Sequence, residues 1–550
     1  MDVRLAPALA LAGSICCLLA SAQALASGPD PRPPESLPKA PPGYVVGARE
    51  AVAIARHDSV VAEQSRRYGR LETLVTATDD GAWQVDYRAG GRGVAQVVVD
   101  GSSAAVRESW TGYQVAWPMA RGYEGQFGHL LNAPYVWIPL CLIFVAGLLD
   151  WRRPLRIAHL DLLALLAFGA SHVFFNRGEI GISAPLAYPV LVYLLARALW
   201  LGFRGGAPLR PSLEGRWLAL AAICLVAFRI TLNVGDSGVI DVGYAGTIGA
   251  DRIAHGEPLY GEGEFPVENH FGDTYGPVNY FAYLPFELAL PWSGEWDELA
   301  ASHAAAIAFD LATVAGLVAF ALRLRPGRRG RELAAILAFG WLAYPYTAFA
   351  LQANSNDSLV AALLAWSLAL FARPLARGCL LALAVMAKFA PLALVPLYAA
   401  GDRGLTESGR GRLRSPLVFV LAFLAVGALA LAHPAIDPGL GTFWERTVES
   451  QLDRSSPFSI WGQVTDLGWL QAVVLVLVGA LALALAFRPR RRTIAQIAAL
   501  AAAVVIAVQL TAEHWFYLYI PWFTPALLIA LATATPLRAA VSPEPVRAAG

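Results

Sequence analysis

The sequence predicts a polytopic α-helical membrane protein with about 11 full spans and one short helical hairpin, preceded by a small α+β domain. Hydrophobic residues make up 57% of the 550 residues, and charged residues only 15%. A soluble protein would need more polar side chains to cover its surface. Many apolar runs approach or exceed the roughly 20 residues that cross a bilayer core. With a net charge of +1, the chain has no overall positive electrostatic field that would attract nucleic acid.

The first 44 residues are predicted to be a secretory signal followed by a linker. Residues 1–26 combine Arg4, an apolar run and the small residues Ala24 and Ala26 of an A-x-A cleavage site. An uncleaved anchor helix is the alternative. Residues 27–44 are rich in proline and favour an extended linker. The five cysteines of the chain lie in apolar runs, so no disulfide framework and no thiolate metal site is predicted.

Residues 45–115 have the pattern of a small extracytoplasmic α+β domain. "GAREAVAIARH" predicts a short helix, and "LETLVTAT", "DDG" and "AWQVDYRAG" predict a hairpin in which Trp83, Val85 and Tyr87 share one face. A second strand pair surrounds the turn at Asp100 and Gly101. This order resembles a PepSY domain, which would imply a module that binds or restrains a partner. A spacer without a ligand is the alternative.

The loops between the apolar runs predict the orientation of the chain. We expect three additional transmembrane helices in 133–203, a membrane core over 216–535 and a cytoplasmic tail at 536–550. Residues 377–400 favour two short segments, a hairpin broken around Pro391. With this hairpin, alternating loops carry arginine clusters on the inner side, and the outer loops carry only Arg177, Arg252, Arg446 and Arg454. The pattern predicts a multi-pass protein of the plasma membrane whose N-terminal domain and active site are extracytoplasmic and whose C-terminus is cytoplasmic.

A polar loop that begins at Asp236 is predicted to lie on the outer side. "DVGYAGTIGADRIAH" can form a short surface helix that starts at Asp241 and stops at Gly256. A carboxylate at the start of a helix is stabilised by the helix dipole. An ionised base at the membrane edge suits the removal of a proton from a sugar hydroxyl. The alternative is that Asp241 only caps the helix.

Aromatic and cationic side chains accumulate on the same predicted side. Aromatic rings in residues 260–286 favour the membrane interface and can stack on sugars. Lys388 would be costly inside the membrane unless it is paired. Cations near the outer leaflet suit a lipid-linked phosphate, although an arginine in a loop is often only a solvated charge. Near the end of the chain, Glu513 and His514 reach this side.

Together these motifs resemble glycosyltransferase family 87, C-type glycosyltransferases of the polyprenyl-phosphate-mannose-dependent kind. Asp241 and Tyr244 are followed by "GEPLY" and "YGPVNYFAYLPF", and a Q-x-N element and a K-x-x-P hairpin come later in the chain. The resemblance covers about residues 216–535. The chain departs from it at Gly276, which replaces a proline, and in its added N-terminal spans and domain. These departures leave the substrate more open than the fold.

The resemblance implies a C-type glycosyltransferase-like fold and an inverting hexosyl transfer outside the cytoplasm. A sugar, for which the resemblance suggests mannose, would move from a polyprenyl-phosphate donor to a glycan or glycolipid of the cell envelope. Asp241 would be the general base, with Asp236 the second candidate. No cofactor is implied, and a divalent metal is possible but not required. The implied substrate-binding residues are Tyr244, Tyr260, Tyr275, Gln352, Asn354, Asn356, Lys388, Arg446, Arg454 and His514, of which Lys388, Arg446, Arg454 and His514 would hold the leaving phosphate.

Two other function classes remain open. A transporter or lipid-linked-sugar flippase would carry charges deep within its spans or internal repeats. Asp161 and Asp310 lie within predicted spans, but no repeat is evident. A regulatory membrane sensor would use the PepSY-like domain as its receptor, and its outer loops would be dispensable.

Overall fold

The computed structural model describes residues 40–41, 43–78, 80–122, 128–266, 269, 271–294, 299–401, 414–452, 456–490 and 492–535. The predicted signal peptide 1–26, residues 27–39 of the linker, Arg454 and the predicted tail 536–550 lie outside these ranges. The chain divides into two compact units. The smaller consists of Gln23–Tyr123 and Phe174–Ile180, and the larger includes Glu124–Val173 and Gly181–Gly550.

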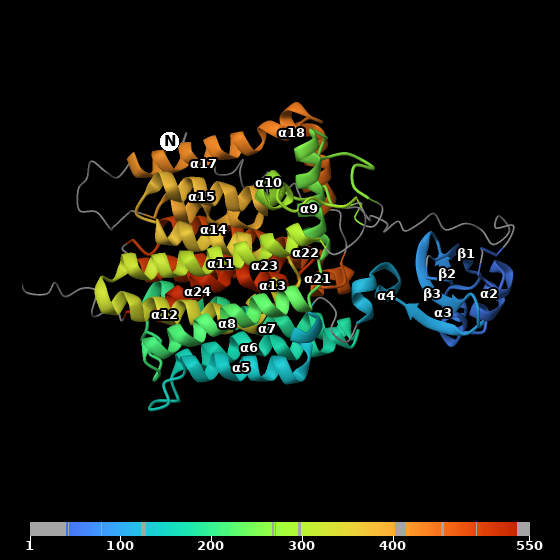
Figure 1. Ribbon diagram of the computed structural model, residues 1–550, viewed down its shortest axis with the longest axis horizontal. Coiled ribbons are helices and arrows are strands. Elements are labelled where there is room, and N and C mark those ends of the chain that lie inside the picture. The colour runs from blue at the N-terminus through green and yellow to red at the C-terminus, as the bar shows by residue number, and fades with distance from the viewer. Residues whose placement is uncertain are drawn as a thin grey trace, which may run out of the picture. The chain divides into compact units, whose positions relative to one another are not determined.

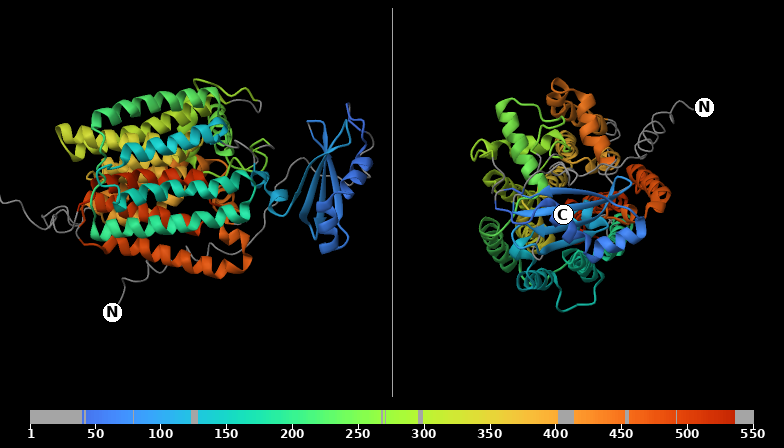
Figure 2. Two further views of the ribbon diagram at one scale, coloured as in Figure 1. Left: turned by 90° about the horizontal axis from the view of Figure 1, so that it is seen from below. Right: turned by 90° about the vertical axis from the view of Figure 1, so that its right-hand side faces the viewer.

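The smaller unit contains two helices followed by a four-stranded antiparallel meander. The helices are α2 (Ala48–Arg56) and α3 (Ser59–Tyr68). The strands are β1 (Glu72–Ala77), β2 (Ala82–Ala89), β3 (Arg92–Asp100) and β4 (Val106–Thr111), paired in that order. Figure 2 shows the helices against one face of the sheet. The short helices α4 (Tyr113–Ala116) and η2 (Pro118–Arg121) follow β4.

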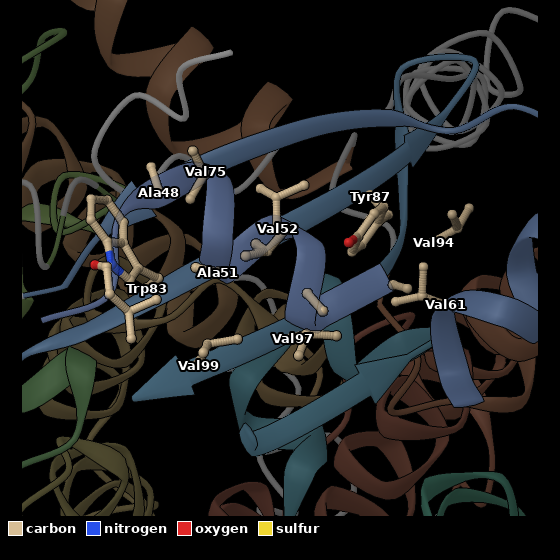
Figure 3. Packing of buried hydrophobic residues seen from close by; sticks show 14 residues of the cluster. Ala48, Ala51, Val52, Val61, Val75, Trp83, Tyr87, Val94, Val97 and Val99 are labelled. Carbon is tan, nitrogen blue, oxygen red and sulfur yellow. The ribbon is translucent and has the colours of Figure 1, made fainter. Parts of the chain in front are cut away.

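The core of this unit follows from the alternation of apolar residues in the strands. Trp83, Val85 and Tyr87 are buried, and Val85 lies opposite Val75 on β1 and Val97 on β3. Their common face is therefore confirmed. The helix α2 covers it with small side chains, as Figure 3 shows, and the Trp83 indole N–H donates to the Val46 carbonyl oxygen at 2.8 Å. The PepSY-like character of the unit remains a prediction.

The larger unit is a bundle of α-helices (Figure 1). The helices that form most of the bundle are α5 (Pro134–Leu148), α6 (Ile157–Asn176), α7 (Ile180–Arg204), α8 (Gly215–Gly235), α9 (Asp241–His255), α10 (Pro277–Glu287), α11 (Ala300–Leu324), α12 (Gly327–Ala343), α13 (Pro345–Gln352), α14 (Asp357–Ala369), α15 (Pro374–Ala387), α16 (Val395–Ala399), α17 (Arg414–Ala430), α22 (Gly468–Phe487), α23 (Ile494–Thr511) and α24 (Ile520–Thr533). Short elements connect them: η3 (His129–Asn132), η5 (Ala390–Leu394), α18 (Ala432–Ile436), α19 (Leu440–Trp444), the π-helix η7 (Glu445–Glu449), α20 (Ser450–Leu452), α21 (Ile460–Gln463), η8 (Thr465–Leu467) and η9 (Tyr517–Tyr519).

The composition of this bundle is that of a multi-pass membrane protein. Among the described residues, six helices are long and apolar enough to cross a membrane, or seven if α12 and α13, bent by 58°, form one span. The predicted number of 11 spans is not confirmed, because several apolar segments form helices of only 10–17 residues. On α22, Trp469, Val476 and Leu477 are exposed, as expected of a helix that contacts lipid. In contrast, α23 is largely buried in the bundle.

The chain reverses direction at Lys388. Helix α15 follows α14 and ends at Ala387, where Lys388 reaches Asp357 at the start of α14. The segment η5–α16 then returns along the bundle, because the Tyr398 hydroxyl lies 3.2 Å from the Ser367 hydroxyl near the other end of α14. The predicted hairpin thus has its reversal at Lys388, slightly before Pro391. A break here places a polar residue at one end of the bundle.

Helix α9 runs across that end of the bundle, transverse to the long helices (Figure 1). Its packing depends on three glycines spaced three residues apart. A Cβ on Gly243 would lie 2.5 Å from the Asn354 carbonyl oxygen, and one on Gly246 would lie 2.5 Å from the Tyr283 ring. A Cβ on Gly249 would lie 2.2 Å from the Tyr280 ring. The glycines therefore allow α9 to approach α10 and the α13–α14 junction closely.

We expect Gly249→Ala to destabilise the protein by about 1–3 kcal/mol, because overpacking in a core forces side chains and backbone apart. Tyr280 is fully buried and cannot move into solvent. Thermal unfolding of the purified protein measures the effect. Gly479→Ala on α22 is the matched control, since nothing lies within 4 Å of its Cβ position. Equal melting temperatures for the two variants would contradict the proposed packing of α9.

Candidate active site

Asp241 is the first residue of α9, and its side chain is exposed. The N-cap is Ile240, which offers no side-chain hydrogen bond. The Val242 backbone N–H donates to Asp241 Oδ1 at 2.8 Å. An exposed carboxylate at a helix N-terminus is stabilised as an anion and accessible to a ligand. The N-cap position belongs to Ile240, so Asp241 is not the helix cap that the alternative predicted, and its exposed carboxylate suits a base.

The backbone around Asp241 is held from two sides. The Gly238 N–H donates to the Gln352 carbonyl at 3.3 Å, and the Ile240 N–H donates to the Ala353 carbonyl at 3.0 Å. On the other side, the buried Asn269 amide donates to the Asp241 carbonyl at 3.0 Å. The base candidate is consequently attached to the junction between α13 and α14.

Gln352, Asn354 and Asn356 form this junction and are fully buried. The Gln352 amide donates to the Arg229 carbonyl at 3.3 Å, and the Asn356 amide donates to Asn279 Oδ1 at 2.6 Å. Within the described ranges, Gln352 Oε1, Asn356 Oδ1 and Asn279 Nδ2 have no hydrogen-bond partner. Buried amide atoms without a partner are costly. They are therefore candidates for contacts with polar ligand groups.

Lys388 is paired, as a lysine at this depth requires. Its ammonium lies 2.6 Å from Oδ1 of the fully buried Asp357, which also accepts from the Trp522 indole at 2.7 Å. The ammonium also lies 5.5 Å from the ring centroid of Tyr519 and 5.2 Å from that of Trp522. The amine is thus held between a carboxylate and two aromatic rings. Sequence reasoning missed Asp357, although it directly follows Asn356.

The three predicted tyrosines belong to an apolar cluster formed by α9, the loop that follows it and α10. Tyr244 and Tyr260 are buried in a cluster that includes Tyr280 and Phe443, and Tyr275 packs against it. The Tyr260 hydroxyl donates to the Tyr275 carbonyl at 3.1 Å. Burial raises the pKa of Tyr260 well above its usual value, so its hydroxyl stays neutral. These rings shape the loop beside Asp241.

Arg446 forms a bidentate ion pair with Asp273, at 2.5 and 2.9 Å. Asp273 is almost completely buried and also accepts from the Gly261 N–H at 3.2 Å. The hydrogen bonds that Arg446 donates to Asp273 raise the pKa of the guanidinium above its usual value. This ion pair attaches η7 to the loop between α9 and α10, residues 256–276, which is called the aromatic loop. Neither Asp273 nor its pairing was evident from the sequence.

His514 and Asp236 have local partners of their own. His514 lies in the loop after α23, and its Nδ1 is 2.9 Å from the hydroxyl of the buried Ser456. Burial raises the pKa of the adjacent Glu513 carboxyl. Asp236 accepts from the Leu130 N–H at 2.8 Å, and its carboxylate lies 3.4 Å from His129 Nδ1.

The predicted residues thus form two connected groups. The segment before Asp241 is hydrogen-bonded to the carbonyls of residues 352 and 353 and to the Asn354 side chain, and Asn356 precedes the partner of Lys388 in the chain. Tyr519 connects Lys388 with His514, whose ring centroid lies 6.5 Å from the Tyr519 centroid. The second group joins Tyr244, Tyr260, Tyr275 and Arg446 around the aromatic loop.

The charges within the spans are paired with one another. Asp161 accepts from Arg197 at 2.9 Å, and Asp310 accepts from Arg229 at 2.6 Å and from the Trp341 indole at 2.8 Å. These ion pairs give the two aspartates a structural role. Their presence within spans therefore does not require a transport function. No group of three or more His, Cys, Asp or Glu side chains suited to a metal occurs in the part of the chain that the structure describes.

Comparisons with known proteins give a family match and a similar solved structure. No curated protein matches the chain. The crystal structure of ArnT from Cupriavidus metallidurans bound to undecaprenyl phosphate is similar, with a TM-score of 0.39 and 16% identity, and the alignment covers 58% of this chain and 59% of that one. The model of glycosyltransferase family 87 matches residues 274–512, within the predicted core, and the match includes Tyr275 and Lys388 but begins after Asp241. By this match, residues 274–512 resemble the family that the motifs predicted, glycosyltransferase family 87.

Proposed function

We propose that the chain is a membrane glycosyltransferase that moves a sugar from a polyprenyl-phosphate donor to an extracytoplasmic glycan or glycolipid. One observation carries the proposal. The loop that presents the exposed Asp241 is hydrogen-bonded to residues 352–353, inside the segment that matches glycosyltransferase family 87. A carboxylate fixed beside a glycosyltransferase segment is suited to activating an acceptor hydroxyl.

In the proposed reaction, Asp241 takes the proton from the acceptor hydroxyl while that oxygen attacks the anomeric carbon. The bond between this carbon and the phosphate oxygen breaks, and polyprenyl phosphate leaves. A single displacement of this kind inverts the anomeric configuration. It needs a base and stabilisation of the leaving phosphate, and no cofactor.

We further propose that Lys388, Arg446, Arg454 and His514 supply the charge for the leaving phosphate. Lys388 and Arg446 already bind Asp357 and Asp273, so any phosphate contact is shared with a carboxylate. The resemblance favours mannose as the sugar, and the acceptor is a hydroxyl-bearing group of the cell envelope. Tyr244, Tyr260 and Tyr275 would shape the substrate loop, and Gln352 and Asn356 would contact substrate hydroxyls.

We expect membranes that contain the full chain to transfer labelled sugar from polyprenyl-phosphate mannose and not from GDP-mannose. Transfer should persist in a chelator, because the proposed chemistry uses a carboxylate base and cationic side chains. Membranes without the protein are the control, and polyprenyl-phosphate glucose tests the choice of sugar. Transfer only from the nucleotide sugar would contradict the proposed donor.

A further inference from the structure

Asn354 lies at the junction of α13 and α14 in an unusual backbone conformation. Its φ of 47° is in the left-handed region, which residues other than glycine rarely adopt. Asparagine tolerates this region better than most residues. Strained conformations of this kind persist where the surrounding structure fixes them, and they often occur at functional sites.

The Asn354 side chain is fixed by three hydrogen bonds. Its Nδ2 donates to the Ser237 hydroxyl at 3.0 Å and to the Gly238 carbonyl at 2.9 Å. Its Oδ1 accepts from the Asn233 amide at 2.8 Å. A side-chain amide has two N–H donors, so both are used within the protein. Asn354 consequently has no N–H to offer a substrate in this conformation.

These bonds connect the end of α8, the loop before α9 and the α13–α14 junction. They act together with the two backbone bonds from Gly238 and Ile240 to residues 352 and 353. Gly243, in the first turn of α9, approaches the Asn354 carbonyl so closely that a Cβ would lie 2.5 Å from it. The residues before and after Asp241 therefore both contact Asn354.

We propose that Asn354 is a positioning residue that holds Asp241 in place for proton abstraction, and that it does not contact the substrate. The inference rests on the proposed function and assigns Asn354 a different role from the one that the family resemblance implies. Because a small displacement of a catalytic group lowers the rate strongly, loss of this support acts on kcat. Substrate affinity changes little, because no substrate contact is lost.

The test combines two readouts on the full chain in lipid nanodiscs. Hydrogen–deuterium exchange of residues 236–243 measures the support directly and requires no activity. Transfer from labelled polyprenyl-phosphate mannose gives kcat and KM. Asn354→Gly accepts the backbone conformation and removes the three side-chain bonds. Asn354→Asp has the same shape, keeps the acceptor and loses both donors. Ser367→Ala, at the distant end of α14, is the control.

For both Asn354 variants we expect at least about tenfold faster exchange in residues 236–243 and a kcat about 10- to 100-fold lower, with KM within about twofold. Ser237→Ala, which removes one of the acceptors, should give a smaller change in the same direction. Ser367→Ala should resemble the wild type in both readouts.

Other outcomes separate the inference from the proposed function. Unchanged exchange in either Asn354 variant would overturn the inference, whatever the activity. A raised KM with normal kcat would do the same, because it identifies a substrate contact. If the wild type transfers no sugar from any polyprenyl-phosphate donor, the proposed function fails. Faster exchange in the variants would then still establish that Asn354 holds the Asp241 segment.

Discussion

Replacement of Asp241 by Asn is expected to lower the rate of sugar transfer by about 10²- to 10⁴-fold, the usual contribution of a general base. Asparagine has the same shape but cannot accept the proton of the attacking hydroxyl. The exposed position of Asp241 means that the change removes no buried ion pair. Folding should therefore be preserved, and the loss should appear in kcat in assays with labelled polyprenyl-phosphate mannose.

Asp236→Asn is the matched control in the same loop. Asp236 already binds the Leu130 N–H and lies beside His129, so we expect a smaller effect on transfer. Both variants should elute and melt like the wild type. Loss of transfer in the Asp236 variant with near-normal transfer in the Asp241 variant would assign the base to Asp236 instead.

Lys388→Met is expected to destabilise the protein by about 3–5 kcal/mol, because it leaves the carboxylate of Asp357 buried without its cation. Asp357 is fully buried, and among the described residues only the Trp522 indole would still donate to Oδ1. The double variant Lys388→Met/Asp357→Leu should recover most of this loss, since removing both charges of a buried pair is often neutral. Thermal unfolding in detergent or nanodiscs compares the three proteins.

The double variant also separates stability from phosphate binding. If Lys388 contacts the donor phosphate, the recovered protein should show a KM for polyprenyl-phosphate mannose at least about tenfold higher, since charge-assisted hydrogen bonds to phosphate are strong. A normal KM would limit Lys388 to a structural role. A single Lys388→Met variant as stable as the wild type would contradict the buried pair itself.

The periodic parts of the fold could be predicted from the sequence. Trp83, Val85 and Tyr87 alternate, and they form the buried face of the sheet. A hairpin broken around Pro391 was predicted, since one span over residues 377–400 would turn the later arginine clusters outward, and the chain reverses nearby at Lys388. The number of spans was harder to predict, because Pro345 and the polar run 352–356 interrupt apolar segments and produce short or bent helices.

For the candidate site, the sequence indicated residues more readily than their roles. Lys388 was recognised as a cation that needs a partner, but Asp357 was not identified as that partner. Tyr244 and Tyr260 were predicted from motifs as substrate contacts, and the structure places both in the apolar cluster of α9, the following loop and α10. Hydropathy does not reveal that an aromatic loop folds on itself. Asn354 was expected at a substrate, and only the positions of Ser237, Gly238 and Asn233 reveal that its amide is occupied.

The central claim is that the carboxylate at position 241 acts as a base on the extracytoplasmic side of the membrane. The most direct measurement is labelling of an Asp241→Cys variant, in a background without the native cysteines, by a membrane-impermeant thiol reagent on intact cells. We expect labelling from outside before lysis, as for a cysteine placed at the exposed Gly256. Labelling of position 241 only after the cells are opened would place it on the cytoplasmic side and exclude this role for Asp241.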